Sequence, residues 1–140
     1  MNPLETINRI MTRDVVTVQL HDSMSTVRSI LRSRPFHHVP VLKGDLLVGM
    51  LSSADPARLA LDAYVPDQET ADAHLDAAFS VEAAMSPEPV SIQASDTVRR
   101  AAEILGDGDI HFLPVTDETG RLLGMVTSTD LIRYLARQYS

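Results

Sequence analysis

Residues 38–55 read HVPVLKGDLLVGMLSSAD, and residues 112–130 read FLPVTDETGRLLGMVTSTD. Both stretches contain an apolar residue followed by Pro-Val, then a turn with a glycine, and then Gly-Met-apolar-Ser/Thr ending in an aspartate. Matches in the same order within one chain indicate an internal repeat, and such a repeat decides the architecture. The two stretches therefore predict a duplicated fold.

The duplication extends outward from these stretches over most of the chain. A shift of 74 residues superposes the two halves as far as the Pro-Val segments, and one extra residue in the second turn then raises the shift to 75. The matched pairs include Met11/Met85, Val16/Val90, Gln19/Gln93, Asp22/Asp96, His37/His111, Pro40/Pro114, Gly49/Gly124, Ser53/Ser128 and Asp55/Asp130.

Each half predicts the element order β-α-β-β-α. Short β-branched strands are expected at 15–18 and 90–92, each followed by an amphipathic helix that is capped by Asp22 or Ser23 and by Ser95 or Asp96. Two strands joined by a hairpin turn should follow at 39–42 and 46–51, and again at 112–116 and 122–126. A closing helix should begin near Ser53 and near Ser128.

The expected organisation is two repeats of mixed α/β class, residues 1–61 and 81–140, separated by an acidic linker at 62–80. One repeat has too little apolar surface for a core of its own, so we expect the two to pack together with pseudo-two-fold symmetry. Residues 68–79 have the pattern of a modestly amphipathic helix. A solvated linker helix is favoured for this segment over a binding surface.

Composition excludes several classes of function. The formal net charge of −7 argues against general binding to nucleic acid or to an anionic membrane. The absence of cysteine excludes disulfides and thiolate chemistry, and it is compatible with the reducing cytosol. With neither a signal-peptide pattern nor an apolar run of about 18 residues, a cytoplasmic location is expected.

These motifs together resemble the cystathionine-β-synthase (CBS) domain, which occurs as a tandem pair called a Bateman module. The resemblance is carried by the lead-ins ending Met-Thr and Met-Ser, by the apolar-Pro-Val strands, and by the closing Ser/Thr-x-x-Asp. It covers nearly the whole chain apart from the linker. It implies a stand-alone regulatory module that binds a small ligand. Since the serines, histidines and aspartates show no spacing typical of a nucleophile or a metal site, no enzymatic activity is expected.

The Thr127-x-x-Asp130 spacing has two interpretations. The hydroxyl and the carboxylate form a capping box that satisfies the free N–H groups at the start of a helix. Alternatively, the aspartate accepts hydrogen bonds from a vicinal diol such as that of ribose, next to the partial positive charge of the helix N-terminus. Spacing alone favours the cap, whereas the resemblance favours the diol.

In the family, a pair of repeats forms two related clefts between them, and each cleft takes residues from the first strand, the proline strand and the Ser/Thr-x-x-Asp segment. The apolar members would enclose a purine, and backbone groups of the first strands would contact its edge. The resemblance implies ligand contacts at Thr17, Val18, His37, His38, Pro40, Ser52, Asp55, Ser91, Ile92, His111, Phe112, Pro114, Thr127 and Asp130.

The expected ligand is an adenine nucleotide or a related adenosyl compound such as S-adenosylmethionine, and no further cofactor is expected. Because no basic cluster is evident, AMP or ADP is favoured over ATP. Adjacent histidines on a strand diverge, so we do not expect His37 and His38 to form a metal site with His111. The alternative is a ligand-free homodimer that regulates an unidentified partner protein, through the apolar side chains Leu131, Ile132, Tyr134 and Leu135; these are equally compatible with a core role.

Overall fold

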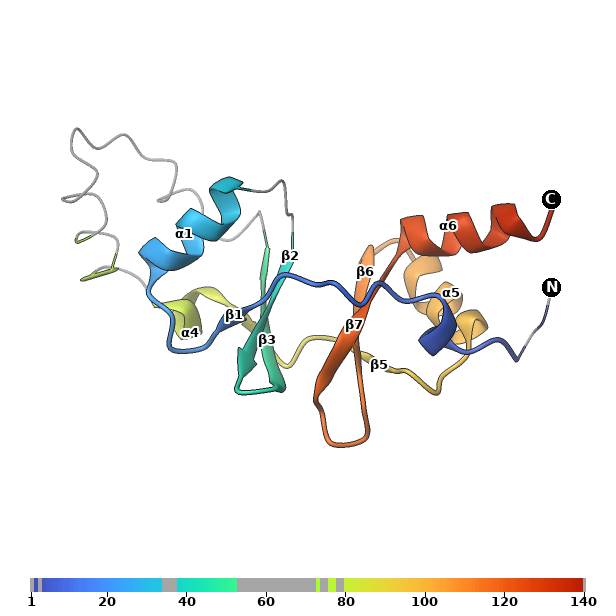
Figure 1. Cartoon of the computed structure of the whole chain (residues 1–140), viewed down its shortest axis with the longest axis horizontal. Helices are drawn as coiled ribbons and strands as arrows, with labels where there is room; N and C mark the ends of the chain where they lie inside the picture. Colours follow the sequence, from blue (N-terminus) through green and yellow to red (C-terminus); the bar gives the residue numbers. More distant parts are fainter. Residues whose placement is uncertain are drawn as a thin grey trace. The chain divides into compact units, whose positions relative to one another are not determined.

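The computed structural model describes residues 2, 4–33, 38–52, 73, 76–77 and 80–139, and at 31–33 and 52 it describes the backbone alone. The chain forms two compact units. One consists of Val16–Pro89 and is called the β1–β4 unit below. The other combines Met1–Val15 with Val90–Ser140 and is called the β5–β7 unit (Figure 1).

The β1–β4 unit is a four-stranded sheet with the order β1-β2-β3-β4. Strand β1 runs parallel to β2, and the pairs β2–β3 and β3–β4 are antiparallel. The buried core consists of Val18, Met24, Val27, Val39, Val41, Leu51 and Val81. The elements are β1 (Val18–Gln19), α1 (Met24–Ser33), β2 (His38–Lys43), β3 (Leu46–Ser52), α4 (Val81–Ala84) and β4 (Ser86–Pro87).

The β5–β7 unit is a three-stranded sheet with the order β5-β6-β7, in which β5–β6 is parallel and β6–β7 antiparallel. Its buried core consists of Ile7, Met11, Ile92, Val98, Ala101, Leu105, Leu113, Val115 and Val126. The elements are the 3-10 helix η1 (Ile7–Arg9), β5 (Ile92–Gln93), α5 (Val98–Gly106), β6 (Phe112–Thr116), β7 (Leu122–Thr127) and α6 (Ser128–Arg137).

Strand registers confirm the duplication residue by residue. In the parallel pairs Val18 lies opposite Val41, and Ile92 lies opposite Val115. Both antiparallel pairs have an irregularity at the same place, between Val41 and Leu42 and between Val115 and Thr116. At the far end of each hairpin, His38 pairs with Ser52 and Phe112 pairs with Thr127.

The predicted N-cap of α5, Ser95 or Asp96, was wrong, because the cap lies at the next residue. Asp96 does not cap α5, because its carboxylate accepts from the Gln93 N–H (2.9 Å) in the preceding turn. The cap is Thr97, whose hydroxyl accepts from the Arg100 N–H at 3.1 Å. Ser23 is confirmed in the first repeat, since α1 begins at Met24 and the Ser23 hydroxyl accepts from the Thr26 N–H.

The first strands are also shorter than predicted and shifted toward the C-terminus. The structure has Val18–Gln19 and Ile92–Gln93 in place of 15–18 and 90–92. Each turn that follows is closed by an aspartate carboxylate that accepts from the strand's glutamine N–H, Asp22 at 2.8 Å and Asp96 at 2.9 Å. These turns hold the glutamines in the sheet and explain the shift.

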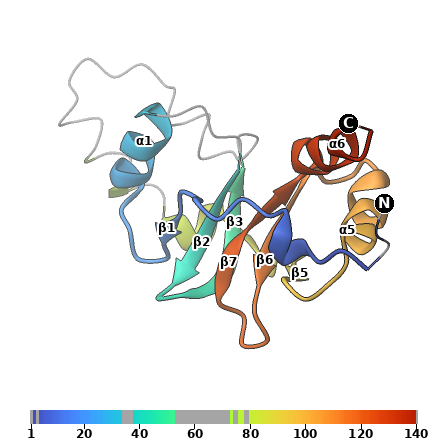
Figure 2. The ribbon, with the colours of Figure 1, turned by 45° about the vertical axis from the view of Figure 1, so that its right-hand side comes forward.

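The lead-ins of the repeats are exchanged between the two units. The first lead-in, residues 4–12, lies in the β5–β7 unit, and the second, residues 80–86, lies in the β1–β4 unit. Ile7 and Val81, which are equivalent in the two repeats, are both fully buried in the core that the other repeat builds. In Figures 1 and 2 the blue N-terminal segment runs beside β7 toward η1 and α5.

A glycine on the last strand of each hairpin admits the exchanged lead-in. A Cβ atom at Gly124 would lie 2.5 Å from the Thr12 carbonyl oxygen. A Cβ atom at Gly49 would overlap the Met85 sulfur. Close approach of backbone therefore requires a glycine at 124, whereas at 49 the nearest neighbour is the end of a flexible side chain.

Residues 68–79 of the linker were expected to be helical, and those of them that the structure describes, Ala73, Asp76 and Ala77, are helical. The Asp76 carboxylate accepts from both the N–H and the hydroxyl of Ser25, each at 2.8 Å, and so stabilises the first turn of α1. The closing helix expected from Ser53 lies outside the described residues. Among the described helices, none is long and apolar enough to span a bilayer.

Candidate ligand site at the start of helix α6

The candidate site of the second repeat forms where β7 passes into α6. Thr127 is the last residue of β7 and the N-cap of α6, and Asp130 lies in the first helical turn. The pair Phe112–Thr127 brings the start of β6 to the same place. Beside them the lead-in contributes Thr12, which is bridged to Met125 on β7.

Thr127 and Asp130 form the predicted capping box. The Thr127 hydroxyl accepts from the Asp130 N–H (3.3 Å), and one carboxylate oxygen, Oδ2, accepts from the Thr127 N–H (2.9 Å). Oδ2 also accepts from the Thr127 hydroxyl at 3.2 Å. The structural interpretation of the Thr-x-x-Asp motif is therefore confirmed.

The cap does not use the whole carboxylate. A carboxylate offers about four acceptor positions on two oxygens. The Asp130 Oδ1 atom is 3.3 Å from the Thr12 hydroxyl, which is the one donor to it among the described residues, and Thr12 is 3.5 Å from Oδ2. An acceptor position on Oδ1 thus remains beside the N-terminus of α6, so capping and ligand binding are compatible.

The other predicted residues of this repeat lie on the same sheet. Ile92 has its side chain in the core, so only its backbone is available to a ligand. Ser91 precedes β5 and is exposed, near Pro114 by the register of Ile92 with Val115. His111 is exposed immediately before β6, and its carbonyl accepts from the Ser128 N–H at 3.0 Å.

The first repeat has the same arrangement as far as it is described. Thr17 is half-buried and precedes β1, where Val18 is buried in the core, and Pro40 is buried on β2. His38 is half-buried and pairs with Ser52, as Phe112 pairs with Thr127. The predicted residues His37 and Asp55 lie outside the described residues, as does the Ser52 side chain.

Positive charge near Asp130 is sparse. Arg13 follows Thr12, but its guanidinium donates to the Asn8 side chain (2.7 Å) and to the Asn8 carbonyl. Arg133 is exposed one turn beyond Asp130 on α6. In the described part of the chain no group of three histidine or acidic residues has the geometry to hold a metal ion.

The pKa of Asp117, in the turn between β6 and β7, lies below its ordinary value of 3.8. The largest cause is the hydrogen bond that its carboxylate accepts from the Thr119 hydroxyl at 2.7 Å. The backbone N–H groups of Thr119 and Arg121 donate to the same oxygen. This exposed turn lies at the hairpin end opposite to Thr127, so it stabilises the hairpin and is separate from the candidate site.

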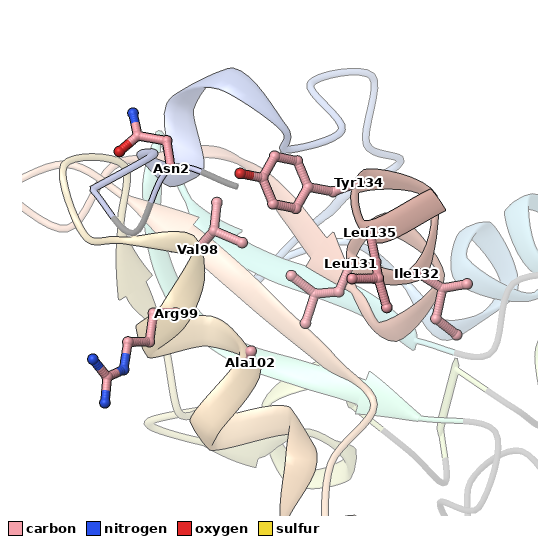
Figure 3. Close-up of a pocket in the computed structure, with 8 residues that line it drawn as sticks. All are labelled: Asn2, Val98, Arg99, Ala102, Leu131, Ile132, Tyr134 and Leu135. Carbon is pink, nitrogen blue, oxygen red and sulfur yellow. The ribbon is translucent and has the colours of Figure 1, made fainter. Parts of the chain in front are cut away.

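A pocket away from Asp130 lies between α5, α6 and the N-terminal residues (Figure 3). It is a pocket of about 430 Å³, lined mainly by apolar side chains, with the Arg99 guanidinium pointing away from it. Arg99 pairs with Glu103 at 3.2 Å. The lining residues are Asn2, Val98, Arg99, Ala102, Leu131, Ile132, Tyr134 and Leu135.

Comparison with known families identifies the class. The sequence profile of the CBS domain matches residues 7–61 and 81–137, so the chain belongs to the CBS domain family. An uncharacterized protein of Methanocaldococcus jannaschii, MJ1225, is 28% identical over 133 residues, 94% of this chain. Its crystal structure matches with a TM-score of 0.77, and the chain spans about half of that protein's length.

Two other solved structures have the same fold and contain adenosine-based ligands. CBSX2, from Arabidopsis thaliana, in complex with AMP has a TM-score of 0.77 and 23% identity, covering 97% of this chain and 99% of its own. The CBS domain pair of MJ0100, in complex with 5′-methylthioadenosine and S-adenosylmethionine, has a TM-score of 0.70 and 21% identity, covering 97% of this chain and 99% of its own.

Similarity to enzymes is confined to a small part of each enzyme. The chain matches 22% of the inosine-5′-monophosphate dehydrogenase of Korarchaeum cryptofilum, over 119 residues at 29% identity. Proteins of the CBS-pair type are typically regulatory, and these partial matches are no evidence of catalysis.

Sequence reasoning missed Thr12 as a neighbour of Asp130. The two residues are 118 positions apart, and no local pattern connects them. One signal was present: Thr12 and Ser86 are equivalent in the two repeats, and both carry a hydroxyl.

Proposed function

We propose that this chain is a regulatory module that binds an adenine nucleotide through the Asp130 carboxylate. The observation that carries the proposal is the remaining acceptor position on Oδ1, beside the capped N-terminus of α6. A ribose presents two adjacent O–H donors, and hydrogen bonds to a charged acceptor are stronger than neutral ones. The remaining position on Oδ1 supplies a charged acceptor for such a hydroxyl.

The ligands of the related structures support an adenosyl compound. AMP, 5′-methylthioadenosine and S-adenosylmethionine differ in charge and in the substituent at the 5′ carbon. They share an adenine and a ribose with a free 2′,3′-diol, which is the group that a fixed aspartate recognises. The sparse positive charge near Asp130 favours a monophosphate or diphosphate over ATP, which carries more negative charge.

The first repeat supplies the equivalent groups, and we extend the proposal to it. Ser52 and Asp55 correspond to Thr127 and Asp130, and Thr17, Val18, His37, His38 and Pro40 complete the set. In the second repeat Ser91, Ile92, His111, Phe112 and Pro114 have these roles. The module requires no further cofactor and performs no reaction of its own.

A ligand panel tests this function by thermal unfolding of the full chain. At a ligand concentration of 100 times the dissociation constant, a single site stabilises the fold by about 2.7 kcal/mol. AMP and ADP should raise the melting temperature more than ATP does, while adenine alone should have little effect. If AMP, ADP, ATP and S-adenosylmethionine all leave the melting temperature unchanged, the proposed function is wrong.

A homodimer formed through α5 and α6 is a second proposal. Ile132 and Leu135 are 65% and 44% exposed at the rim of the apolar pocket, and Tyr139 is 82% exposed nearby in sequence. Exposed apolar side chains that adjoin a pocket commonly mark an interface. A second copy, or an unidentified regulated protein, would cover them.

Light scattering distinguishes the occupants of this surface. The wild-type chain should have the mass of a dimer, and Ile132→Glu should have the mass of a monomer. Arg137→Glu, at an exposed position on the last turn of the same helix, is the charge control. If the wild type is a monomer, the surface is not a homodimer interface, and affinity capture with and without nucleotide then tests a partner protein.

A further inference from the structure

The Thr12 backbone is fixed against β7 by a pair of hydrogen bonds. The Thr12 N–H donates to the Met125 carbonyl, and the Met125 N–H donates to the Thr12 carbonyl, both at 2.8 Å. This approach is close enough that even a methyl group at Gly124 would meet the Thr12 carbonyl oxygen at 2.5 Å. The position of Thr12 is therefore determined by backbone contacts and not by its own side chain.

The Thr12 side chain reaches the carboxylate that the proposed function uses. Its hydroxyl donates to Asp130 Oδ1 at 3.3 Å and lies 3.5 Å from Oδ2. A carboxylate oxygen only accepts, so the direction of this hydrogen bond is certain. The hydroxyl is exposed, and it is the one polar group of the lead-in with a described contact to Asp130.

Hydrogen bonds from two different repeats thus hold the two carboxylate oxygens of Asp130. Oδ2 is held by Thr127 within the second repeat, and Oδ1 by Thr12, which belongs to the first repeat. A terminal carboxylate torsion is broad and rotates easily unless both oxygens are bound. One acceptor position of Oδ1 is used by Thr12, which fixes the direction of the remaining one.

We propose that Thr12 is a positioning residue for ribose recognition: its hydroxyl orients the Asp130 carboxylate, so a residue of the first repeat determines the diol selectivity of the second-repeat site. The inference rests on the proposed function, since it assigns Asp130 as the diol acceptor. Thr12 need not contact the ligand. Because it acts through Oδ1, its loss should weaken ligands with two ribose hydroxyls more than ligands with one.

The test is calorimetric titration of the full chain with AMP and with 2′-deoxyadenosine 5′-monophosphate. An Asp55→Ala background leaves only the second-repeat site to be measured. Thr12→Val removes the hydroxyl and keeps the shape, and Thr12→Ser restores the hydroxyl. Thr26→Val, at an exposed position in the β1–β4 unit, is the matched control for the same chemical change.

Thr12→Val should weaken AMP binding by about 3- to 10-fold, the range expected for one hydrogen bond. Binding of the deoxynucleotide should change less, so the preference for ribose over deoxyribose should fall. Thr12→Ser should restore both the affinity and the preference to within about 2-fold. Thr26→Val should resemble the background protein.

Three results overturn the inference. If Thr12→Val weakens both nucleotides equally, or leaves both unchanged, Thr12 does not orient the carboxylate, although the proposed function stands. If the background protein binds neither nucleotide and the chain with Asp55 intact also binds neither, the proposed function fails and the inference fails with it. Should Thr12→Val not fold, Thr12→Ala removes the same hydroxyl without changing the backbone bridge and takes its place.

Discussion

The two lead-ins perform the same structural task by different local means. In the β5–β7 unit the first lead-in forms η1, whose N-cap residue Thr6 makes no capping hydrogen bond with its side chain. It is held by backbone hydrogen bonds to the unit, among them Ile7 N–H to the Asp96 carbonyl (2.8 Å) and Val98 N–H to the Glu5 carbonyl (2.8 Å). The first lead-in is therefore fixed by contacts distant in sequence.

The second lead-in is stabilised locally. Ser80 caps α4 by accepting from the Ala83 N–H at 3.1 Å, and Ser86–Pro87 then form the edge strand β4 against β3. A proline is tolerated on such an edge strand, because its missing N–H faces no partner. The two lead-ins share a buried apolar residue, a methionine and a hydroxyl, which are Ile7/Val81, Met11/Met85 and Thr12/Ser86. The local structure that positions these residues differs between the two lead-ins.

Truncation of the buried lead-in residues should have the largest effect. Ile7→Ala is expected to cost about 2–5 kcal/mol of unfolding free energy, because the side chain is completely buried. Val81→Ala should cost roughly 1 kcal/mol less, since Val is smaller by one methylene. Denaturant unfolding measures both, and Leu4→Ala, which removes a 74% exposed side chain, is the control. An Ile7→Ala effect as small as that of Leu4→Ala would contradict the docking of η1.

Alanine substitutions of the strand glycines, Gly124 and Gly49, should have the next largest effect on the free energy of unfolding. Gly124→Ala places a methyl group against the Thr12 backbone, which cannot move aside, and should cost about 1–3 kcal/mol. Gly49→Ala mainly meets the flexible Met85 side chain and should cost less. Gly106→Ala on α5 has open space and should be neutral or stabilising. Equal effects at 124 and 49 would show that the first lead-in yields as easily as the second.

Removal of the N-cap side chains should affect the two lead-ins differently. Ser80→Ala should destabilise the β1–β4 unit by about 1 kcal/mol, as expected for loss of an N-cap. Thr6→Ala removes no capping hydrogen bond and should cost less. Hydrogen exchange at the Ala83 and Ile10 amides reports on the two lead-ins separately. A larger loss of protection from Thr6→Ala than from Ser80→Ala would reverse the assignment.

The smallest effect concerns pH and the hairpin between β6 and β7. The lowered pKa of Asp117 means that its carboxylate stabilises the hairpin above the ordinary pKa of 3.8, and that this contribution is lost as the pH falls through the lower folded-state value. Thr119→Val should raise the pKa of Asp117 toward 3.8 in a carboxyl NMR titration. An unchanged titration would show that the Thr119 hydroxyl is not the main cause.

The sequence predicted the repeats, the hairpins and the start of α6 at Ser128, because these follow from local periodicity and turn residues. The cap at Thr97 was missed because several capping residues stand in a row, and the turn uses Asp96. Exchange of the lead-ins was not predicted, since an apolar residue such as Ile7 does not encode which core receives it. For the same reason Thr12 was absent from the predicted site, although Thr127 and Asp130 were found from their spacing.

Recognition of an adenine nucleotide's ribose by Asp130 can be measured by calorimetric titration with AMP. We expect a dissociation constant in the micromolar range, which corresponds to about −8 kcal/mol at 1 μM. In the Asp55→Ala background, Asp130→Asn should weaken binding at least about 10-fold, since loss of a charged hydrogen-bond partner costs roughly 1.5–3 kcal/mol. Absence of AMP binding by the wild-type chain, or an unchanged affinity in Asp130→Asn, would contradict it.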